Sequence, residues 1–240
     1  MNLVKKLVAL AVVFVSLVAA PVFAHSLKDF EDRLVQSEDY FQPVDLPAPD
    51  FALVDGEGRA VRMTDLRGKV VVLNFIYASC GDVCPLHSVM IAQLQAMINE
   101  TPMRDRVAFV SITTDPSHDR GAVLAEYGSS HGLDPVNWTF LTSADGLPED
   151  TTRQLARAYG LEFTATEDGE QMHGVVTHVI DRDGRLRARF HSLRFEPVNL
   201  VMFANALVND VHKPGEETAP QQDFWSWLIS FFAPAGAPQH

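Results

Sequence analysis

Apolar runs rich in β-branched residues alternate with helical patterns along most of the chain. The runs 69–76 and 106–113 are typical of strands buried on both faces of a sheet. After the loop at 77–83, apolar residues recur at helical spacing up to Ile98, with Pro85 in the first turn, where proline is tolerated. The residues of this predicted apolar face are Leu86, Val89, Met90, Leu94, Met97 and Ile98. Further along, the pattern predicts helices at 118–131, 148–159 and 198–211 and a short strand at 138–142.

Two other segments have the pattern of β-hairpins. The first spans 51–63 with a turn at 56–58, and the second spans 175–190 with Asp183-Gly184 as its turn signal. Strands therefore alternate with helices early in the chain, which then finishes in a hairpin and a last helix. This order predicts an α/β fold with a central mixed sheet flanked by helices and an N-terminal β-hairpin.

The first 24 residues have the pattern of an export signal. Lys5 and Lys6 precede a stretch without charge, residues 7–24, which ends in a small residue, Ala24. This pattern predicts a signal peptide that is cleaved after Ala24. The alternative is an uncleaved anchor, because eighteen apolar residues are just long enough to span a bilayer. In both cases the body is exported, either free in the periplasm or tethered to the inner membrane, where pairs of thiols tend to oxidise.

The rest of the chain divides into three segments. Residues 25–45 carry charges without a long period, and the prolines from position 43 onward predict an extended lead-in. Residues 46–211 contain the predicted strands and helices of one domain. Residues 212–240 form a tail whose aromatic cluster, 224–232, is too short to span a membrane. Two interpretations of that cluster stay open: contact with a lipid surface or a partner, and packing back on the domain.

Composition and charge exclude several classes of protein. Hydrophobic residues make up 47% and charged residues 21% of the chain, which excludes wholesale disorder and a multispan membrane protein. The formal net charge of −12 repels phosphate backbones, so we expect no nucleic-acid partner. Two cysteines are too few for a disulfide-rich scaffold, and 240 residues can bury a core without one.

Cys80 and Cys84 are the candidate reactive groups. They lie between a predicted buried strand and the start of a helix, and a spacing of four brings both sulfurs within reach of each other or of one ion. The positive end of the helix dipole favours their thiolates. A structural disulfide is a weak explanation, because so small a loop constrains the unfolded chain little. The cysteines alone leave a redox dithiol and a soft-metal site as alternatives.

A histidine near the cysteines would favour a metal site. If the strand 175–180 lies beside 69–76, the loop before it faces the cysteine loop, and His173 is in that loop. His178 is inside the strand, where a buried, hydrogen-bonded histidine is the ordinary case. We expect His87 on the surface of its helix, although it could approach the site. The other histidines are expected to be solvated or terminal: His25, His118, His131, His191, His212 and His240.

Two thiolates and one imidazole form a soft ligand set of low coordination number. Such a set suits Cu(I), and it holds Cu(II) when a further ligand is added. Structural zinc normally takes four protein ligands, and a fourth is not evident from the sequence.

Four blocks of sequence, in order, resemble the SCO/SenC family of copper proteins that serve the assembly of cytochrome c oxidase. The first is the cysteine motif, Asn74 to Pro85. It is followed by blocks at 111–119, at 138–142 and at 172–184. In the family the ligand histidine stands ten residues before the aspartate of an Asp-Gly turn, as His173 stands before Asp183. The resemblance therefore favours His173 over His178.

The resemblance covers roughly residues 45–210 and implies a thioredoxin-like fold. It also implies a copper site formed by Cys80, Cys84 and His173, and copper delivery to the CuA centre of the oxidase. The partner would be the oxidase subunit that carries CuA, with a thiol reductant or another copper chaperone as a further partner. One departure is Gly81, where the family commonly has proline. The segment 167–178 lacks the proline that thioredoxin-type reductases place beside their dithiol, which favours a metal site.

Two functions therefore compete. The first is an exported copper metallochaperone. The second is an enzyme, a thiol–disulfide oxidoreductase with Cys80 and Cys84 as its catalytic dithiol. A peroxide-reducing thiol enzyme is a weaker third, because the sequence places no threonine or arginine partner beside the cysteines. The first two roles are compatible, since a Cys80–Cys84 disulfide would switch copper binding off.

Overall fold

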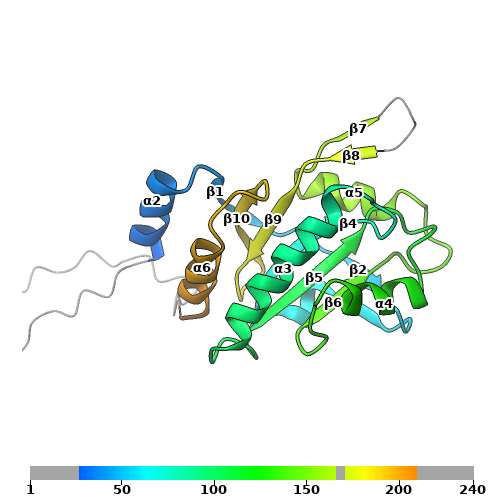
Figure 1. Cartoon of the computed structure of the whole chain (residues 1–240), viewed down its shortest axis with the longest axis horizontal. Coiled ribbons are helices and arrows are strands. Elements are labelled where there is room, and N and C mark those ends of the chain that lie inside the picture. Colours follow the sequence, from blue (N-terminus) through cyan, green and yellow to red (C-terminus); the bar gives the residue numbers. More distant parts are fainter. Residues whose placement is uncertain (1–26, 166–170, 210–240) are drawn as a thin grey trace, which may run out of the picture. The chain divides into compact units, whose positions relative to one another are not determined.

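A six-stranded mixed sheet forms the centre of the protein (Figure 1). The computed structural model describes residues 27–165 and 171–209. In order across the sheet, the strands are β1 (Phe41–Pro47), β10 (Arg185–His191), β9 (Val176–Ile180), β4 (Val70–Ile76), β5 (Val107–Thr113) and β6 (Trp138–Leu141). Strands β4, β5 and β6 are parallel, whereas β9 is antiparallel to β4, β10 to β9 and β1 to β10. The predicted α/β fold with a mixed sheet is confirmed.

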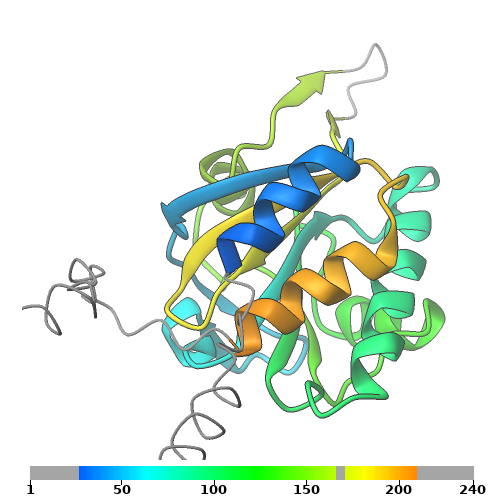
Figure 2. The same ribbon diagram turned by 90° about the vertical axis from the view of Figure 1, so that its left-hand side faces the viewer.

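Helices cover both faces of this sheet. Helices α2 (Leu27–Ser37), α3 (Val83–Asn99) and α6 (Pro197–Asn209) pack on one face, where α2 and α6 lie side by side (Figure 2). The other face is covered by α5 (Thr151–Ala158), the 3-10 helix η1 (Met63–Leu66) and the predicted hairpin, formed by β2 (Ala52–Val54) and β3 (Ala60–Arg62). Helix α4 (Ala122–Ser130) lies beside β6. Among the described residues, no helix is both long and apolar enough to cross a bilayer.

The segment 25–45 is not the extended lead-in that we expected. It contains α2, whose apolar residues Leu27, Phe30 and Leu34 share one face and pack on the core. It also contains most of β1, an edge strand that tolerates its prolines because one side of it makes no ladder bonds. The buried carboxylate of Glu38 accepts hydrogen bonds from the Glu196 N–H and the Asn199 side chain, which ties this segment to the start of α6.

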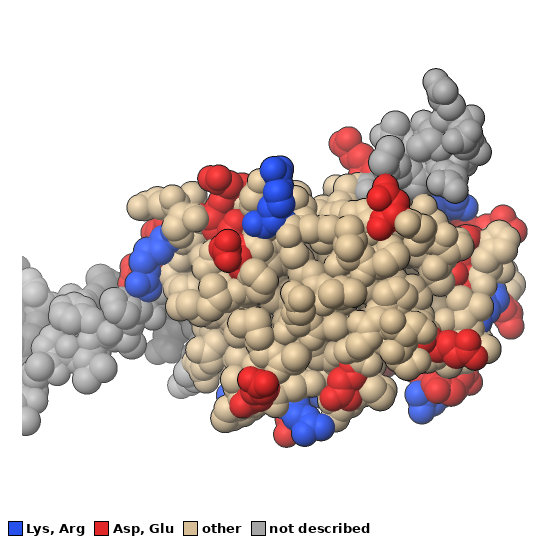
Figure 3. Space-filling view, viewed as in Figure 1, with Lys and Arg blue, Asp and Glu red and all other residues tan. Residues whose placement is uncertain are grey.

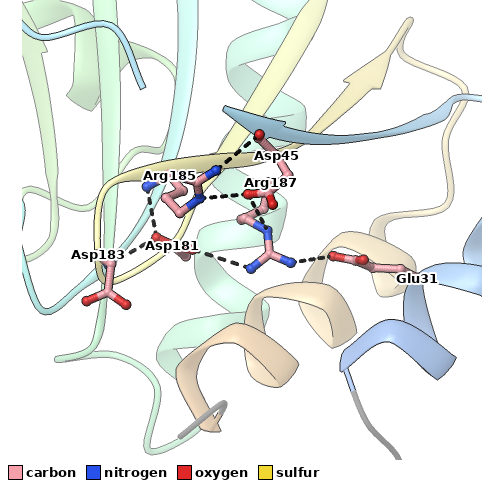
Figure 4. Close-up of polar contacts among 6 residues, drawn as sticks. All are labelled: Glu31, Asp45, Asp181, Asp183, Arg185 and Arg187. Carbon is pink, nitrogen blue, oxygen red and sulfur yellow. Dashed lines mark hydrogen bonds and ion pairs between the residues drawn. The ribbon is translucent and has the colours of Figure 1, made fainter. Parts of the chain in front are cut away.

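Charged side chains also fix α2 to the sheet (Figure 4). Arg187 of β10 contacts Glu31 of α2 at 2.9 Å and Asp181 at 3.4 Å. Its neighbour Arg185 contacts Asp45 of β1 at 2.7 Å. Burial raises the pKa of Glu31 even though the Arg187 guanidinium lowers it, so desolvation offsets much of the attraction in this pair.

The buried face of α3 differs from the predicted one. Leu86 and Val89 are 60% and 45% exposed. The residues facing the sheet are Cys84, His87, Ser88, Ile91, Leu94, Gln95 and Ile98. Three of these are polar and find hydrogen-bond partners, which helical spacing of apolar residues cannot reveal. The outer surface of α3 carries no charge from 83 to 99, and Figure 3 shows charged side chains only around the margins of this face.

A second small hairpin lies where the sequence suggested a loop. Strands β7 (Phe163–Ala165) and β8 (Gln171–His173) pair antiparallel, with Phe163 opposite His173, and project beyond the sheet (Figure 1). His173 therefore belongs to a strand. The predicted signal segment 1–24 and the tail 212–240, with its aromatic cluster, lie outside the described residues.

Candidate metal and redox site

The two cysteines lie in the loop between β4 and α3, as predicted. The chain leaves β4 at Ile76 and turns at once, since the Cys80 N–H donates to the Tyr77 carbonyl at 3.3 Å. Cys80 is 8% exposed and Cys84 is 2% exposed, and both are free thiols. They pack with Ile76 and with aromatic residues of α4 and β6 in one apolar cluster. The dithiol thus lies at the edge where parallel strands end, a common place for sites in α/β proteins.

The Cys80 sulfur accepts hydrogen bonds from the start of α3. The Cys84 N–H donates to it at 3.4 Å, and the Asp82 N–H and the Cys84 thiol also donate to it. Burial alone would raise the pKa of Cys80, but these hydrogen bonds outweigh burial and lower it below its usual value. The first turn of α3 therefore stabilises a thiolate on Cys80.

Cys84 has the opposite environment. Its burial raises the pKa of the thiol, and the hydrogen bond to Cys80 and the negative charges of Cys80 and Asp119 raise it further. In the reduced, metal-free protein, Cys80 consequently loses its proton more readily than Cys84.

Asp119, in the segment between β5 and α4, anchors the cysteine loop. This carboxylate is 1% exposed, and it accepts hydrogen bonds from the Ala78 N–H at 2.9 Å and the Thr113 hydroxyl at 2.5 Å. Burial raises the pKa of Asp119 despite these bonds. The sequence includes Asp119 in the block 111–119 but gives it no role in the site. Its position in the segment that follows β5 is a further signal, since the carboxyl ends of parallel strands meet at one edge.

Tyr127 of α4 closes the cluster around the thiols. Its hydroxyl lies 2.8 Å from the Ser88 hydroxyl of α3, and its ring stacks on His131 at 4.1 Å. Burial raises the pKa of Tyr127 to about 12, so the phenol stays neutral beside the cysteines.

The backbone brings His173 toward the same edge. Strand β9 runs antiparallel to β4, with Thr177 opposite Asn74, so β9 begins near the end of β4, from which the cysteine loop departs. His173 lies three residues before β9, at the end of β8. Its side chain is outside what the structure describes, and its role as a copper ligand stays a prediction.

His178 lies on the other face of the sheet. Adjacent residues of a strand point to opposite faces, and Thr177 contacts α3, so His178 points toward α5. It is fully buried edge-on to Phe75 and Tyr159, and its Nε2 lies 3.2 Å from the Tyr159 carbonyl oxygen. Burial, with a contribution from Arg189, lowers the pKa of His178 to about 3. It is a neutral core histidine, directed away from Cys84.

The remaining described histidines differ in exposure. The expectation that His87 lies on the helix surface is wrong: it is 2% exposed, and its Nε2 lies 2.9 Å from the Thr177 hydroxyl. His118 is exposed, as expected, and the carboxylate of Asp115 raises its pKa. His131 and His191 are half-buried rather than fully solvated. Among the side chains that the structure describes, no three His, Cys, Asp or Glu residues form a metal-binding group.

The donor atoms at this edge suit a soft ion. Two adjacent cysteine sulfurs, of which Cys80 has a lowered pKa, are ligands that favour Cu(I) over hard cations. Gly81 is exposed, and a Cβ built there meets nothing within 4 Å, so neither packing nor a left-handed backbone demands glycine at this position.

Comparison with known proteins identifies relatives of this chain. The family model for SCO1/SenC matches residues 42–202. A SCO1 protein homolog of Bacillus subtilis is 22% identical over 157 residues, which cover 65% of this chain and 79% of that protein. Homologous Sco structures have been determined with copper bound.

Two solved structures illustrate the similarity. A SCO1/SenC family lipoprotein from Bacillus anthracis superposes with a TM-score of 0.62 at 24% identity, over 69% of this chain and 97% of that one, which shows the thioredoxin-like fold. ScoI of Bradyrhizobium japonicum with copper bound gives a TM-score of 0.55 at 26% identity, over 67% of this chain and 98% of that one.

Proposed function

Because this chain belongs to the SCO1/SenC family, we propose that it is an exported metallochaperone that delivers copper to the CuA centre of cytochrome c oxidase. Sco proteins are a family of cytochrome c oxidase assembly proteins, and copper is the ion found in their structures. The observation that carries the proposal is the pair of adjacent cysteines at the β4–α3 edge, where hydrogen bonds from the start of α3 lower the pKa of Cys80.

Cys80, Cys84 and His173 are the proposed ligands. Cys80 has the lower pKa of the two, and a thiol that is still protonated loses its proton to solvent when it takes up Cu(I). Copper binding therefore strengthens as the pH rises. The imidazole of His173 completes a three-coordinate set for Cu(I), and an added ligand would adapt it to Cu(II). Shallow burial of Cys80 suits an ion that must leave again.

The surface beside the dithiol supports a protein partner. Leu86 and Val89 are exposed on the first turns of α3 after Cys84, on a helix without charged residues (Figure 3). Exposed apolar side chains that border a polar rim are typical of contact surfaces. The proposed partner is the oxidase subunit that carries CuA. A thiol reductant or another copper chaperone would keep the dithiol reduced or loaded.

Export is part of the proposal. Residues 1–24 would be cleaved after Ala24 or would tether the domain to the inner membrane from the periplasmic side. The aromatic cluster 224–232 is proposed to contact the membrane surface, where Trp and Phe side chains are favourable. The mass of the protein purified from periplasm and from membranes distinguishes cleavage from tethering.

Copper transfer tests the proposal directly. The protein loaded with Cu(I) is mixed anaerobically with a metal-free soluble CuA domain, and the copper content of each is measured after separation. We expect copper on the CuA domain from wild type and from His118→Ala, a change at an exposed histidine. We expect none from Cys84→Ser, which cannot be loaded. Retention of all copper by the wild-type protein would contradict delivery.

The unequal cysteines also support the second candidate function, thiol–disulfide exchange. The Cys80 thiolate attacks a client disulfide, forms a mixed disulfide and releases one client thiolate. Cys84 loses its proton, attacks the Cys80 sulfur, forms the Cys80–Cys84 disulfide and releases the second client thiolate. Two electrons pass to the client. Cys84→Ser would trap the mixed disulfide on Cys80, which mass spectrometry detects, whereas Cys80→Ser would trap none.

A further inference from the structure

A row of polar side chains crosses the sheet beneath the start of α3. Asn74 of β4 lies opposite Thr177 of β9 and opposite Ser111 of β5. None of the three is more than 1% exposed, and the Ser111 hydroxyl donates to the Asn74 side-chain oxygen at 2.8 Å. Polar groups in a sheet core cost stability unless they are hydrogen-bonded. The position of this row, below the turn that carries Cys84, suggests a role beyond packing.

Helix α3 is bonded to one end of this row. His87 Nε2 and Thr177 Oγ1 lie 2.9 Å apart and share a hydrogen bond, with both residues buried. His87 is three residues after Cys84, so the two side chains lie on the same face of the helix. The bond thus joins the cysteine helix directly to β9.

Thr177 is four residues after His173 on the same stretch of chain. The His87–Thr177 bond therefore lies one helical turn from one proposed ligand and four residues from another. We propose that this bond is a brace that sets the separation between Cys84 and His173, which makes His87 and Thr177 positioning residues of the copper site. The inference rests on the proposed copper ligands.

Physical reasoning supports a brace at this position. The ladder between β4 and β9 fixes Thr177 within the sheet but does not fix α3 above it. A metal site built from a helix and a separate strand loses affinity when the two elements shift, and substitution of supporting residues typically costs 10–100-fold in metal affinity. A hydrogen bond in a dry interior also has a preferred length and angle, which apolar contacts lack.

Substitutions at Thr177 test the brace. Thr177→Val removes the hydroxyl and keeps the β-branched shape, whereas Thr177→Ser keeps the hydroxyl. Gln95→Met is the matched control, because Gln95 lies on the same buried face of α3 and bonds to Asp134 and Asn137, farther from Cys84. For each variant we would measure the Cu(I) dissociation constant against a competing chelator and the thiolate-to-Cu(II) absorption bands.

We expect Thr177→Val to weaken Cu(I) binding about tenfold and to shift the absorption bands. Thr177→Ser should bind like wild type, and Gln95→Met should lower thermal stability without changing either copper property. In a His173→Ala background, Thr177→Val should have no further effect, because the brace acts through His173.

Three results would overturn the brace but not the proposed function, given that the wild-type protein binds copper. They are unaltered copper binding by Thr177→Val, equal losses of copper affinity in Thr177→Val and Gln95→Met, and an undiminished effect of Thr177→Val in the His173→Ala background. Absence of copper binding by the wild-type protein would instead overturn the proposed function, and the brace with it.

Discussion

Cys80 and Cys84 share one loop but meet different electrostatic surroundings. Two backbone amides at the start of α3 donate to the Cys80 sulfur, whereas Cys84 is more deeply buried and the negative charge of Asp119 raises its pKa. Helix-terminal N–H groups stabilise a thiolate, and burial with nearby negative charge disfavours one.

The two thiols should therefore react at different rates. In the reduced, metal-free protein at neutral pH, we expect iodoacetamide to modify Cys80 before Cys84, because the thiolate is the reactive species. Peptide mapping by mass spectrometry at short reaction times measures the order. Cys84→Ser serves as the control, since it should leave Cys80 reactive. Modification of Cys84 first would contradict the lower pKa of Cys80.

His178 should make stability depend on pH. Its pKa is about 3 in the folded protein against an ordinary value of 6.5, so the unfolded chain binds a proton that the folded chain excludes. The stability due to the neutral imidazole is present above the ordinary value and is lost as the pH falls toward the folded value. The loss is at most about 1.4 kcal/mol per pH unit.

The test compares wild type with His178→Met by urea unfolding between about pH 4 and about pH 7. We expect the free energy of unfolding of wild type to fall more steeply toward low pH than that of the variant. Parallel curves for the two proteins would show that His178 does not titrate as its burial requires.

At the scale of single residues, the sequence predicts those features that depend on the spacing of neighbouring residues along the chain. The positions of Cys80 and Cys84 at a strand–helix junction, and the burial of His178 within a strand, follow from local pattern. The burial of His87 and the contact of Asp119 with the Ala78 N–H do not. Both depend on partners far along the chain, which only the tertiary structure brings together.

Arg187 joins elements that are distant in sequence. It contacts Glu31 from α2 and Asp181 from the β9–β10 turn, and its side chain is 18% exposed (Figure 4). Removal of one partner from a buried ion pair leaves the others with uncompensated charge. Arg185, on the same strand, is more exposed and pairs with Asp45, itself largely exposed.

Arg187→Met should therefore lower the free energy of unfolding by about 3 kcal/mol. Arg185→Ala, the matched control, should cost less than about 1 kcal/mol, because an exposed pair contributes little. Urea unfolding measures both. Equal effects of the two substitutions would show that burial of the network does not govern its contribution.

At the scale of elements, the central strands and flanking helices are predictable because their apolar periodicity is strong. The predicted helix at 118–131 is shortened to Ala122–Ser130, since Asp115 to Arg120 form turns that Asp119 ties to the cysteine loop. Helix α2 is not evident from the sequence because only three apolar residues form its buried face, and charged residues separate them. Hairpin β7–β8 was missed because three-residue strands carry almost no pattern.

On the scale of the whole molecule, the negative charge of the chain does not extend over the surface of α3 beside the dithiol. The chain carries a net charge of −12, yet the α3 surface that borders the dithiol has no charged residue. The two cysteine sulfurs lie at the end of the parallel strands, and the proposed third ligand, His173, lies three residues before β9, which begins near the same edge. Copper bound only by the folded state would also stabilise the domain.

An anaerobic Cu(I) titration of the reduced protein against a competing chelator tests the central claim most directly, with wild type, His173→Ala and His178→Met measured side by side. We predict that the wild-type protein binds a single equivalent of Cu(I). His173→Ala should lower the affinity about tenfold or more, which corresponds to about 1.4 kcal/mol, and His178→Met should bind with wild-type affinity. Equal affinity in all three proteins would contradict His173 as the third ligand. Failure of wild type to bind copper would contradict the metallochaperone and leave the Cys80–Cys84 dithiol as a reductase.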